Sequence, residues 1–260
     1  MGTSQSISPG VAGDPSWGKT SSSISNLANR IDKENANPSI LHNSKYQQKR
    51  TNSFKKTLSN YIKAAGGKSS MSSGSSSKGG KAAISTARSL GGVLYRSSQG
   101  EFNDYVAKSG FENIQNKSKS DLVHFLMEDL CGPTNNFDEA AAKAALNEFL
   151  EQILEGTEDA KDVEDALNES VQDQGIDNLL VDYFGFYVFE HLYEMFEERL
   201  FASKGEKLCN QTMGEIKDFV FSEIKVLNDN TKLSSIDWEQ SSKHDSIVKN
   251  IFSNVIEIFE

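Results

Sequence analysis

IDNLLVDYFGFYVFEHLYEMFEERLFA, residues 176–202, is the most apolar segment of this 260-residue chain. It is far too long for a single strand, and it contains no proline that would interrupt a helix. A helix that is apolar on nearly every face is normally buried, since each face then needs a packing partner. We therefore expect residues 176–202 to form the central helix of a hydrophobic core.

Helical patterns flank this segment on both sides, and alternating strand patterns are nearly absent. We expect Ser120 and Asn136 to cap two helices before it, and Thr212 with Glu215 to form a capping box that opens a helix after it. The predicted helices are two short ones around Gly91–Gly92, then 121–131, 137–154, about 159–173, 215–227, and a last one with Ile247, Ile251, Val255 and Ile258 on one stripe. The sequence predicts an all-α helical bundle over residues 81–260.

The first 80 residues have a different composition. Residues 1–44 are rich in Ser, Gly, Asn and Pro, and residues 67–80 form a Ser/Gly-rich stretch. Between them, Phe54, Leu58, Tyr61 and Ile62 recur at helical spacing. We predict a long disordered arm over residues 1–80 that carries one short basic amphipathic helix at 45–66, followed by the acidic helical domain 81–260.

The charge is divided along the chain. The formal net charge is −10, but residues 1–100 hold 14 basic and 3 acidic side chains, and the other 160 hold 13 basic and 34 acidic ones. Lys49, Arg50, Lys55 and Lys56 on the predicted basic helix are a possible contact patch for nucleic-acid phosphates. The same residues could instead lie against the acidic half of the chain or an acidic partner. Both interpretations stay open, with docking favoured.

Several classes of protein are disfavoured. The sequence has no apolar run long enough to span a membrane and no secretory signal, and Cys131 and Cys209 do not make a disulfide framework. We expect a cytoplasmic protein with both cysteines buried as small hydrophobes. His124 and His191 have carboxylates at helical spacing, but not in the order that di-iron bundles use. The sequence predicts no catalytic residue, no metal site and no cofactor.

The N-terminus offers a reactive group, the free amine of Gly2. Removal of Met1, which a small second residue permits, leaves the unhindered amine of Gly2, followed by Thr3 and Ser4. Such an amine is a good nucleophile for acylation, with an ordinary pKa of about 7.7–8.0. The same start satisfies the myristoylation pattern through Ser6. An unmodified start is the alternative.

Three segments in this order resemble one known family. They are the start MGTSQS on a Ser/Gly/Pro-rich arm, ARSLGGVLYRSS at 87–98, and DLVHFLMEDLCGPTNNFDEAAAKAALNEFLEQI at 121–153. The chain is similar here to the B component of the bacterial Qat anti-phage defence system, from the N-terminus to about residue 155. It departs from that family by lacking a Pro-Pro-Trp run near the start, so no docking role is carried over to Trp17.

The resemblance implies a non-enzymatic member of a four-component operon. The other members would be an ATPase, a QueC-like (QatC-type) enzyme related to those that make 7-cyano-7-deazaguanine, and a TatD-like nuclease. We expect the QueC-like enzyme to bind the chain, to read Thr3 and Ser4, and to join a deazapurine carbonyl to the amine of Gly2. The competing hypothesis is an adaptor whose basic helix holds nucleic acid for the nuclease.

Overall fold

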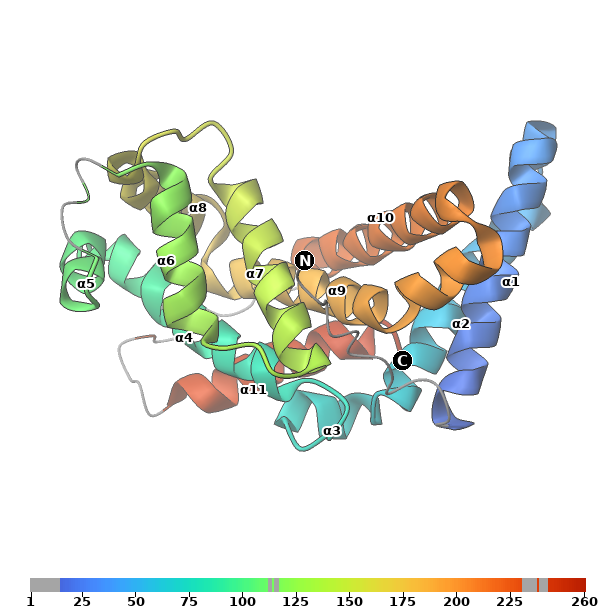
Figure 1. Cartoon of the computed structure of the whole chain (residues 1–260), viewed down its shortest axis with the longest axis horizontal. Helices are drawn as coiled ribbons and strands as arrows, with labels where there is room; N and C mark the ends of the chain where they lie inside the picture. The colour runs from blue at the N-terminus through green and yellow to red at the C-terminus, as the bar shows by residue number, and fades with distance from the viewer. Residues whose placement is uncertain (1–14, 112–113, 115–116, 231–237, 239–242) are drawn as a thin grey trace, which may run out of the picture.

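A computed structural model describes residues 15–111, 114, 117–230, 238 and 243–260 (Figure 1). In this part of the chain the regular structure is helical, and no β-strand is found. The prediction of an all-α fold is therefore confirmed. The helices are α1 Gly18–Ala36, α2 Ser44–Ala64, α3 Gly67–Ser73, α4 Lys81–Ser98, α5 Phe102–Lys108, α6 Lys119–Cys131, α7 Phe137–Ile153, α8 Val163–Gln174, α9 Ile176–Lys204, α10 Glu206–Asn230 and α11 His244–Glu257.

Helix α9 lies at the centre of the fold, as the apolar segment predicts. It packs against α7, α10, α11, α4 and α8, so side chains on several of its faces are buried at once. Tyr183, Phe184 and Tyr187 are fully buried. The ring of Phe184 stacks on Phe252 of α11, with ring centroids 4.3 Å apart. In the predicted stripe of α11, Ile247, Ile251 and Val255 are buried, and Ile258, which follows the last helical residue, is half-buried.

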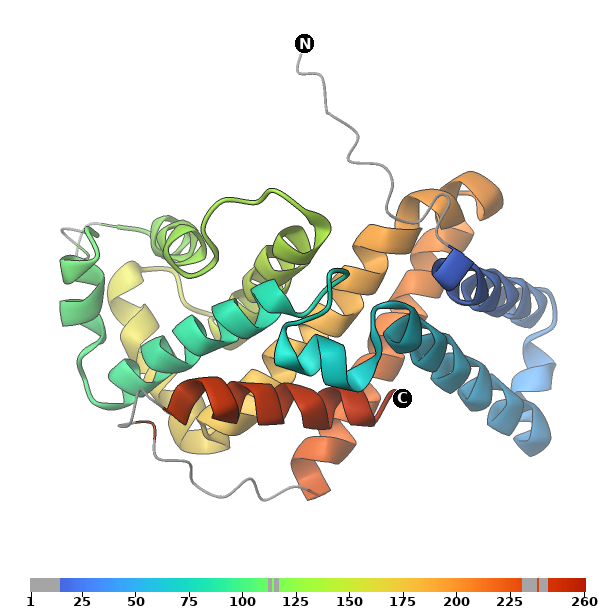
Figure 2. The same ribbon diagram turned by 90° about the horizontal axis from the view of Figure 1, so that it is seen from below.

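The helices form two ends joined by the α9–α10 pair (Figure 1). Helices α5, α6, α7 and α8 gather at one end, and the hairpin of α1 and α2 lies at the other. Seen from below, α3, α4 and α11 cross the space between the ends (Figure 2). One hydrophobic cluster runs from Trp17 to Phe259, so it includes residues from both sides of the boundary that the sequence suggests at residue 80.

The prediction of disorder is wrong for residues 15–44 and 67–80. Helix α1 occupies part of the stretch expected to be disordered, and α3 occupies part of the expected Ser/Gly linker. The physical reason is a sparse but regular stripe: Ile24, Leu27, Ala28 and Ile31 lie at helical spacing and are all buried. Low average hydrophobicity conceals such a stripe, because the serines and asparagines around it lie on the outer face.

The basic amphipathic helix predicted at 45–66 is confirmed as α2. Asn43 caps it by accepting a hydrogen bond from the backbone N–H of Tyr46. The predicted stripe of Phe54, Leu58, Tyr61 and Ile62 is buried. Phe54 stacks on Phe219 of α10 at 5.1 Å between ring centroids, which attaches the α1–α2 hairpin to the rest of the core.

Two glycines expected to separate short helices lie instead inside one helix. Helix α4 runs through Gly91 and Gly92 without interruption. Glycine is needed at Gly91 because the ring of Trp238 lies on it: a Cβ atom there would be 2.5 Å from that ring. Gly91 is therefore required by a close tertiary contact and does not mark a break between two helices.

Two predicted helix starts are also corrected. Helix α6 is capped by Ser118, which forms a capping box with Asp121, and not by Ser120. Thr212 opens no helix, because α10 has already begun at Glu206, and the Thr212 hydroxyl donates to the carbonyl of Leu208 at 2.6 Å. Asn136 caps α7 as expected.

Candidate functional site

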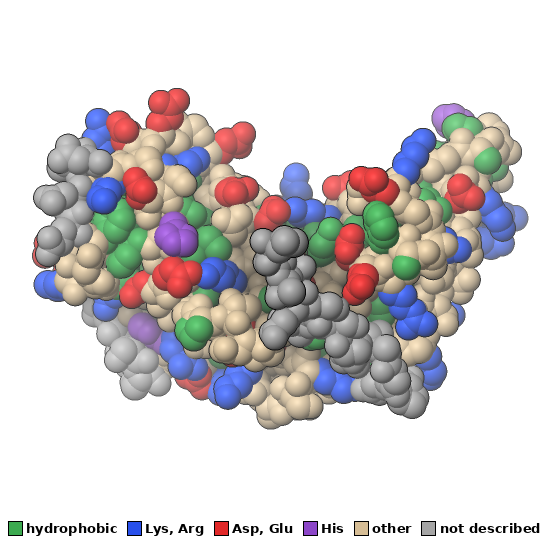
Figure 3. Space-filling view, viewed as in Figure 1, with side chains coloured by type: hydrophobic (Ala, Val, Ile, Leu, Met, Phe, Trp, Pro, Cys, Tyr) green, Lys and Arg blue, Asp and Glu red, His purple; other side chains and the backbone are tan. Residues whose placement is uncertain are grey.

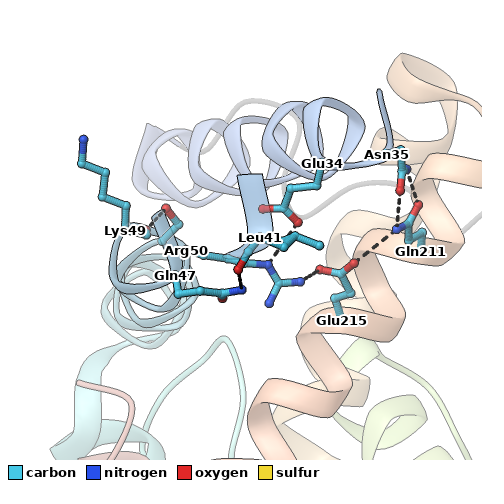
Figure 4. Close-up of polar contacts among 9 residues, drawn as sticks. Glu34, Asn35, Leu41, Gln47, Lys49, Arg50, Gln211 and Glu215 are labelled. Atoms are coloured by element: carbon cyan, nitrogen blue, oxygen red, sulfur yellow. Dashed lines mark hydrogen bonds and ion pairs between the residues drawn. The ribbon is translucent and has the colours of Figure 1, made fainter. Parts of the chain in front are cut away.

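Four cations predicted as a contact patch, Lys49, Arg50, Lys55 and Lys56, all lie on α2 but do not share one environment. Lys49, Lys55 and Lys56 are exposed, and Arg50 is only partly exposed. Two of them are used inside the molecule: Arg50 contacts carboxylates of α1 and α10, and Lys55 lies 3.6 Å from Glu223 of α10. Lys49 points away from the Arg50 cluster (Figure 4).

Arg50 joins three helices (Figure 4). Its Nε atom donates to Glu34 Oε2 of α1 at 3.1 Å, and its Nη2 atom donates to Glu215 of α10. Beside it, Asn35 of α1 and Gln211 of α10 exchange amide hydrogen bonds of 2.7 and 3.1 Å. This cluster fixes the angle at which the α1–α2 hairpin meets α10.

Burial makes the Arg50 cluster sensitive to the loss of its cation. Glu34 is 5 % exposed, and Arg50 is its only ion-pair partner among the described residues. Burial raises the pKa of Glu215, and the charge of Arg50 opposes that rise. The guanidinium also lies over the Phe54 ring at 5.1 Å, so it fills space as well as supplying charge.

We expect Arg50→Ala to lower the free energy of unfolding by about 3 kcal/mol, because it leaves the buried Glu34 carboxylate without a counter-charge. Adding Glu34→Gln should recover at least half of that loss. Lys49→Ala removes the same charge from the same helix and should change stability by less than about 0.5 kcal/mol. Urea unfolding of the four proteins measures this, and equal effects at Arg50 and Lys49 would contradict it.

A second polar cluster lies where the chain enters α4; its histidine and tyrosines are buried, and its carboxylate, Asp138, is partly buried. Asp138 of α7 accepts hydrogen bonds from the backbone N–H groups of Gly80 and Ala82 and from the Tyr187 hydroxyl, at 3.0, 2.9 and 2.6 Å. Tyr61 of α2 lies 2.8 Å from His191 Nδ1 of α9. The ring of His191 lies against Gly79, where a Cβ atom would be 2.8 Å from Nε2.

Burial determines the protonation of this cluster. It lowers the pKa of His191, with the charge of Asp138 opposing the shift, and it raises the pKa of Tyr61 and Tyr187 well above their usual range. The imidazole and both phenols are therefore neutral near pH 7. Since Tyr61, Tyr187 and His191 are fully buried, the cluster holds a Gly-Gly backbone segment in the core.

The remaining candidates from the sequence fall in different places. His124 is exposed on α6, Cys209 is buried, and Cys131 is half-buried beside the Thr86 hydroxyl at 3.7 Å. Among the described residues, no group of three or more His, Cys, Asp or Glu side chains is arranged to hold a metal ion. Gly2, Thr3 and Ser4 lie outside the described residues.

The sequence indicates the candidate residues Arg50 and Tyr61, but it does not indicate which residues they contact. Glu215 is 165 positions from Arg50, and His191 is 130 positions from Tyr61. No local pattern signals contacts at such separations. The charge split between the two parts of the chain was the one available signal that cations of α2 would meet carboxylates of a later helix.

Comparisons with known proteins place the chain in a family. Searches of curated proteins and of solved structures found no significant match. No helix within the described ranges is both long and apolar enough to cross a membrane. The family model described as "QatB: Qat anti-phage system associated protein QatB" matches residues 66–259, from the end of α2 to the end of α11. That match covers most of the chain, and the chain therefore belongs to the QatB family of the Qat anti-phage system.

Proposed function

We propose that this QatB-family chain is a non-catalytic component of the Qat defence system that binds a QueC-like (QatC-type) enzyme and is modified by it on Gly2. The observation that carries the proposal is the family match over residues 66–259, which makes the other Qat operon proteins the expected partners. The operon ATPase and the TatD-like nuclease are further candidate partners. In this proposal the helical body docks, and the N-terminus is the substrate.

The position of Trp17, the first buried residue of the described part of the chain, supports this division of roles. Trp17 is buried against Phe196 of α9 and Tyr61 of α2, with ring centroids 5.6 and 6.2 Å away. The 15 residue-to-residue steps from Gly2 to Trp17 allow a span of at most about 50 Å. When the helical body is docked on the enzyme, the amine of Gly2 stays within that distance of Trp17. This tether raises the effective concentration of the amine at the enzyme's active site.

The proposed step is an acyl transfer. The nitrogen of Gly2 attacks the carbonyl carbon of an activated deazapurine carboxyl group, an amide bond forms, the activating group leaves with the bonding electron pair, and the amine loses a proton. The nucleophile must be the neutral amine, which an N-terminal group with its ordinary pKa of about 7.7–8.0 supplies in part at pH 7. Thr3 and Ser4 would supply the side chains that the enzyme recognises.

Intact mass measures this directly. We expect a mass increment only when the chain is co-expressed with the QueC-like enzyme, and we expect it to map to the peptide that contains Gly2. Gly2→Pro should abolish the increment, since it still permits Met1 removal but replaces the primary amine with a hindered secondary one. Ala12→Pro, a proline in the same segment away from the amine, should retain it. An unmodified mass within a stable complex would contradict the proposal and leave a docking adaptor.

The competing proposal is an adaptor that holds nucleic acid for an associated nuclease. Reversal of all four predicted cations would test it poorly, because Arg50→Glu and Lys55→Glu would also break contacts with Glu215 and Glu223. Reversal of the exposed Lys49 and Lys56 alone separates the two proposals. It should abolish phage defence if nucleic-acid binding is essential, and it should leave the mass increment on Gly2 intact.

A further inference from the structure

The α1–α2 hairpin differs in charge from the rest of the molecule. Residues 15–64 contain nine basic and two acidic side chains, whereas residues 65–260 contain 18 basic and 34 acidic ones. The change falls where the family match begins, at residue 66. Lys and Arg side chains lie along the edge of the molecule that α1 and α2 form (Figure 3). The hairpin is thus a basic unit attached to an acidic body.

A groove of about 510 Å³ runs between the two helices of this hairpin. Three cations line it: Arg30 and Lys33 from α1, and Lys56 from α2. Its other lining side chains are mainly hydrogen-bonding ones, and the lining includes no carboxylate. They are Ser23, Asn26, Asn29, Tyr46, Ser53 and Thr57, together with Leu27.

The groove cations are not neutralised by ion pairs. Among the described residues, the cations of the hairpin that form ion pairs are Arg50, with Glu34 and Glu215, and Lys55, with Glu223. Arg30, Lys33 and Lys56 form none of these pairs. Arg30 lies over the Tyr46 ring at 5.5 Å, which orients its guanidinium without cancelling its charge. The nearest buried carboxylate on α1, Glu34, is already paired with Arg50.

We propose that the groove between α1 and α2 binds the phosphate backbone of single-stranded nucleic acid through Arg30, Lys33 and Lys56, with Lys49 of α2 as a fourth contact one turn beyond the groove. Lys and Arg together with Ser, Thr, Asn and Tyr are the side chains that contact phosphate and sugar oxygens. Single-stranded nucleic acid is commonly held in a positively charged groove that follows its backbone. The proposal does not depend on modification of Gly2.

The spacing of the cations suits a strand that follows the groove. Arg30 and Lys33 are one turn apart on α1, and Lys49 and Lys56 are two turns, about 10 Å, apart on α2. Lys49 lies one turn before the groove residue Ser53 on the same helix. Four phosphates can therefore be contacted from the two sides, while the acidic body repels a strand that leaves the groove.

The charge pattern favours nucleic acid over an anionic membrane. Membrane-binding helices insert bulky apolar side chains next to their cations, and the only aliphatic side chain that lines the groove, Leu27, is fully buried. An acidic protein segment is the other possible occupant. The hydroxyl and amide side chains that line the groove favour phosphodiester oxygens, and the experiment separates the two occupants.

The test is fluorescence anisotropy of a labelled 20-nucleotide oligo(dT) titrated with the full chain at 50 and 200 mM salt. Four contacts predict a slope of about −3 in log affinity against log salt, which is about 50-fold weaker binding at the higher salt. The groove variant Arg30→Glu/Lys33→Glu/Lys56→Glu should bind at least about tenfold more weakly at 50 mM, with a shallower slope. Arg30→Gln/Lys33→Gln/Lys56→Gln should show an intermediate loss.

The matched control is Lys108→Glu/Lys207→Glu/Lys225→Glu, which changes net charge equally at three exposed positions of the acidic body. It should stay within about threefold of the unmodified chain, and all variants should keep their helical circular dichroism. Three results would overturn the proposal: no binding by the unmodified chain at 50 mM salt, equal losses in the groove and control variants, or equally tight binding of a poly-glutamate peptide.

Discussion

Replacing Asp138 with alanine is expected to lower the free energy of unfolding by about 3 kcal/mol, because the Tyr187 hydroxyl and the Ala82 N–H lose their acceptor and the Gly80 N–H keeps only the Tyr187 hydroxyl. The carboxylate receives the backbone N–H groups of Gly80 and Ala82 and the hydroxyl of Tyr187. Tyr187 is fully buried and Ala82 is only partly buried, so the loss at the Tyr187 hydroxyl should make the larger contribution. Each unsatisfied donor costs about 1–3 kcal/mol.

Denaturant unfolding of three variants checks this expectation. Asp138→Asn keeps one carbonyl acceptor and should lose roughly half as much stability as Asp138→Ala. Asp173→Ala removes the same charge from an exposed position near the end of α8, and it should change stability by less than about 0.5 kcal/mol. A loss below about 1 kcal/mol in Asp138→Ala would show that the buried cluster does not hold the start of α4.

Gly80→Ala is expected to cost at least about 3 kcal/mol, since two independent penalties act at one residue. The backbone of Gly80 has φ +98°, where an L side chain is strained. A Cβ atom there would also lie 2.3 Å from the backbone carbonyl oxygen of Met71, which cannot move without displacing α3. Both penalties arise at the residue that precedes α4.

Gly110→Ala separates the two penalties. Gly110 has nearly the same backbone angle, φ +100°, but a Cβ atom there meets nothing within 4 Å. Its substitution should therefore cost only the conformational part, about 1–2 kcal/mol. The difference between the two midpoints of thermal or urea unfolding isolates the clash with Met71. Similar losses in both variants would mean that α3 shifts freely, contrary to the expectation.

Both predictions concern the segment that precedes α4, and their effects should not be additive. Asp138 accepts from the Gly80 N–H, and the same N–H lies 2.7 Å from the Tyr187 hydroxyl. Residues in one hydrogen-bond network commonly couple by about 0.5–3 kcal/mol. Because Tyr61 of α2 and His191 of α9 complete this buried region, disturbance at Gly80 should also reach the α1–α2 hairpin.

Strong periodicity allowed correct prediction of the central elements. The segment 176–202 is apolar on most faces, and a helix of this kind must be buried on most sides. Helix α9 is buried in this way. The stripe of Ile247, Ile251 and Val255 likewise predicts the buried face of α11. In both segments the local pattern and the tertiary environment agree.

The prediction failed where composition was used in place of pattern. Helix α1 is rich in Ser and Asn, yet four apolar side chains at the correct spacing bury it against α2, α9 and α10. Gly91 reads as a break in the sequence, but its place inside α4 depends on Trp238, a residue 147 positions later. Intrinsic propensity is a weak prior, and tertiary contacts override it in both places.

The sequence by itself determined the helical class, the central position of residues 176–202 and the separation of basic from acidic residues, because these follow from side-chain period and charge count. Only the tertiary structure decided which cations stay exposed. Arg50 is held by Glu34 and Glu215, while Arg30 and Lys56 face a groove formed by two helices. Ion pairing depends on distances between helices far apart in the chain, and such distances are set by how the whole core packs.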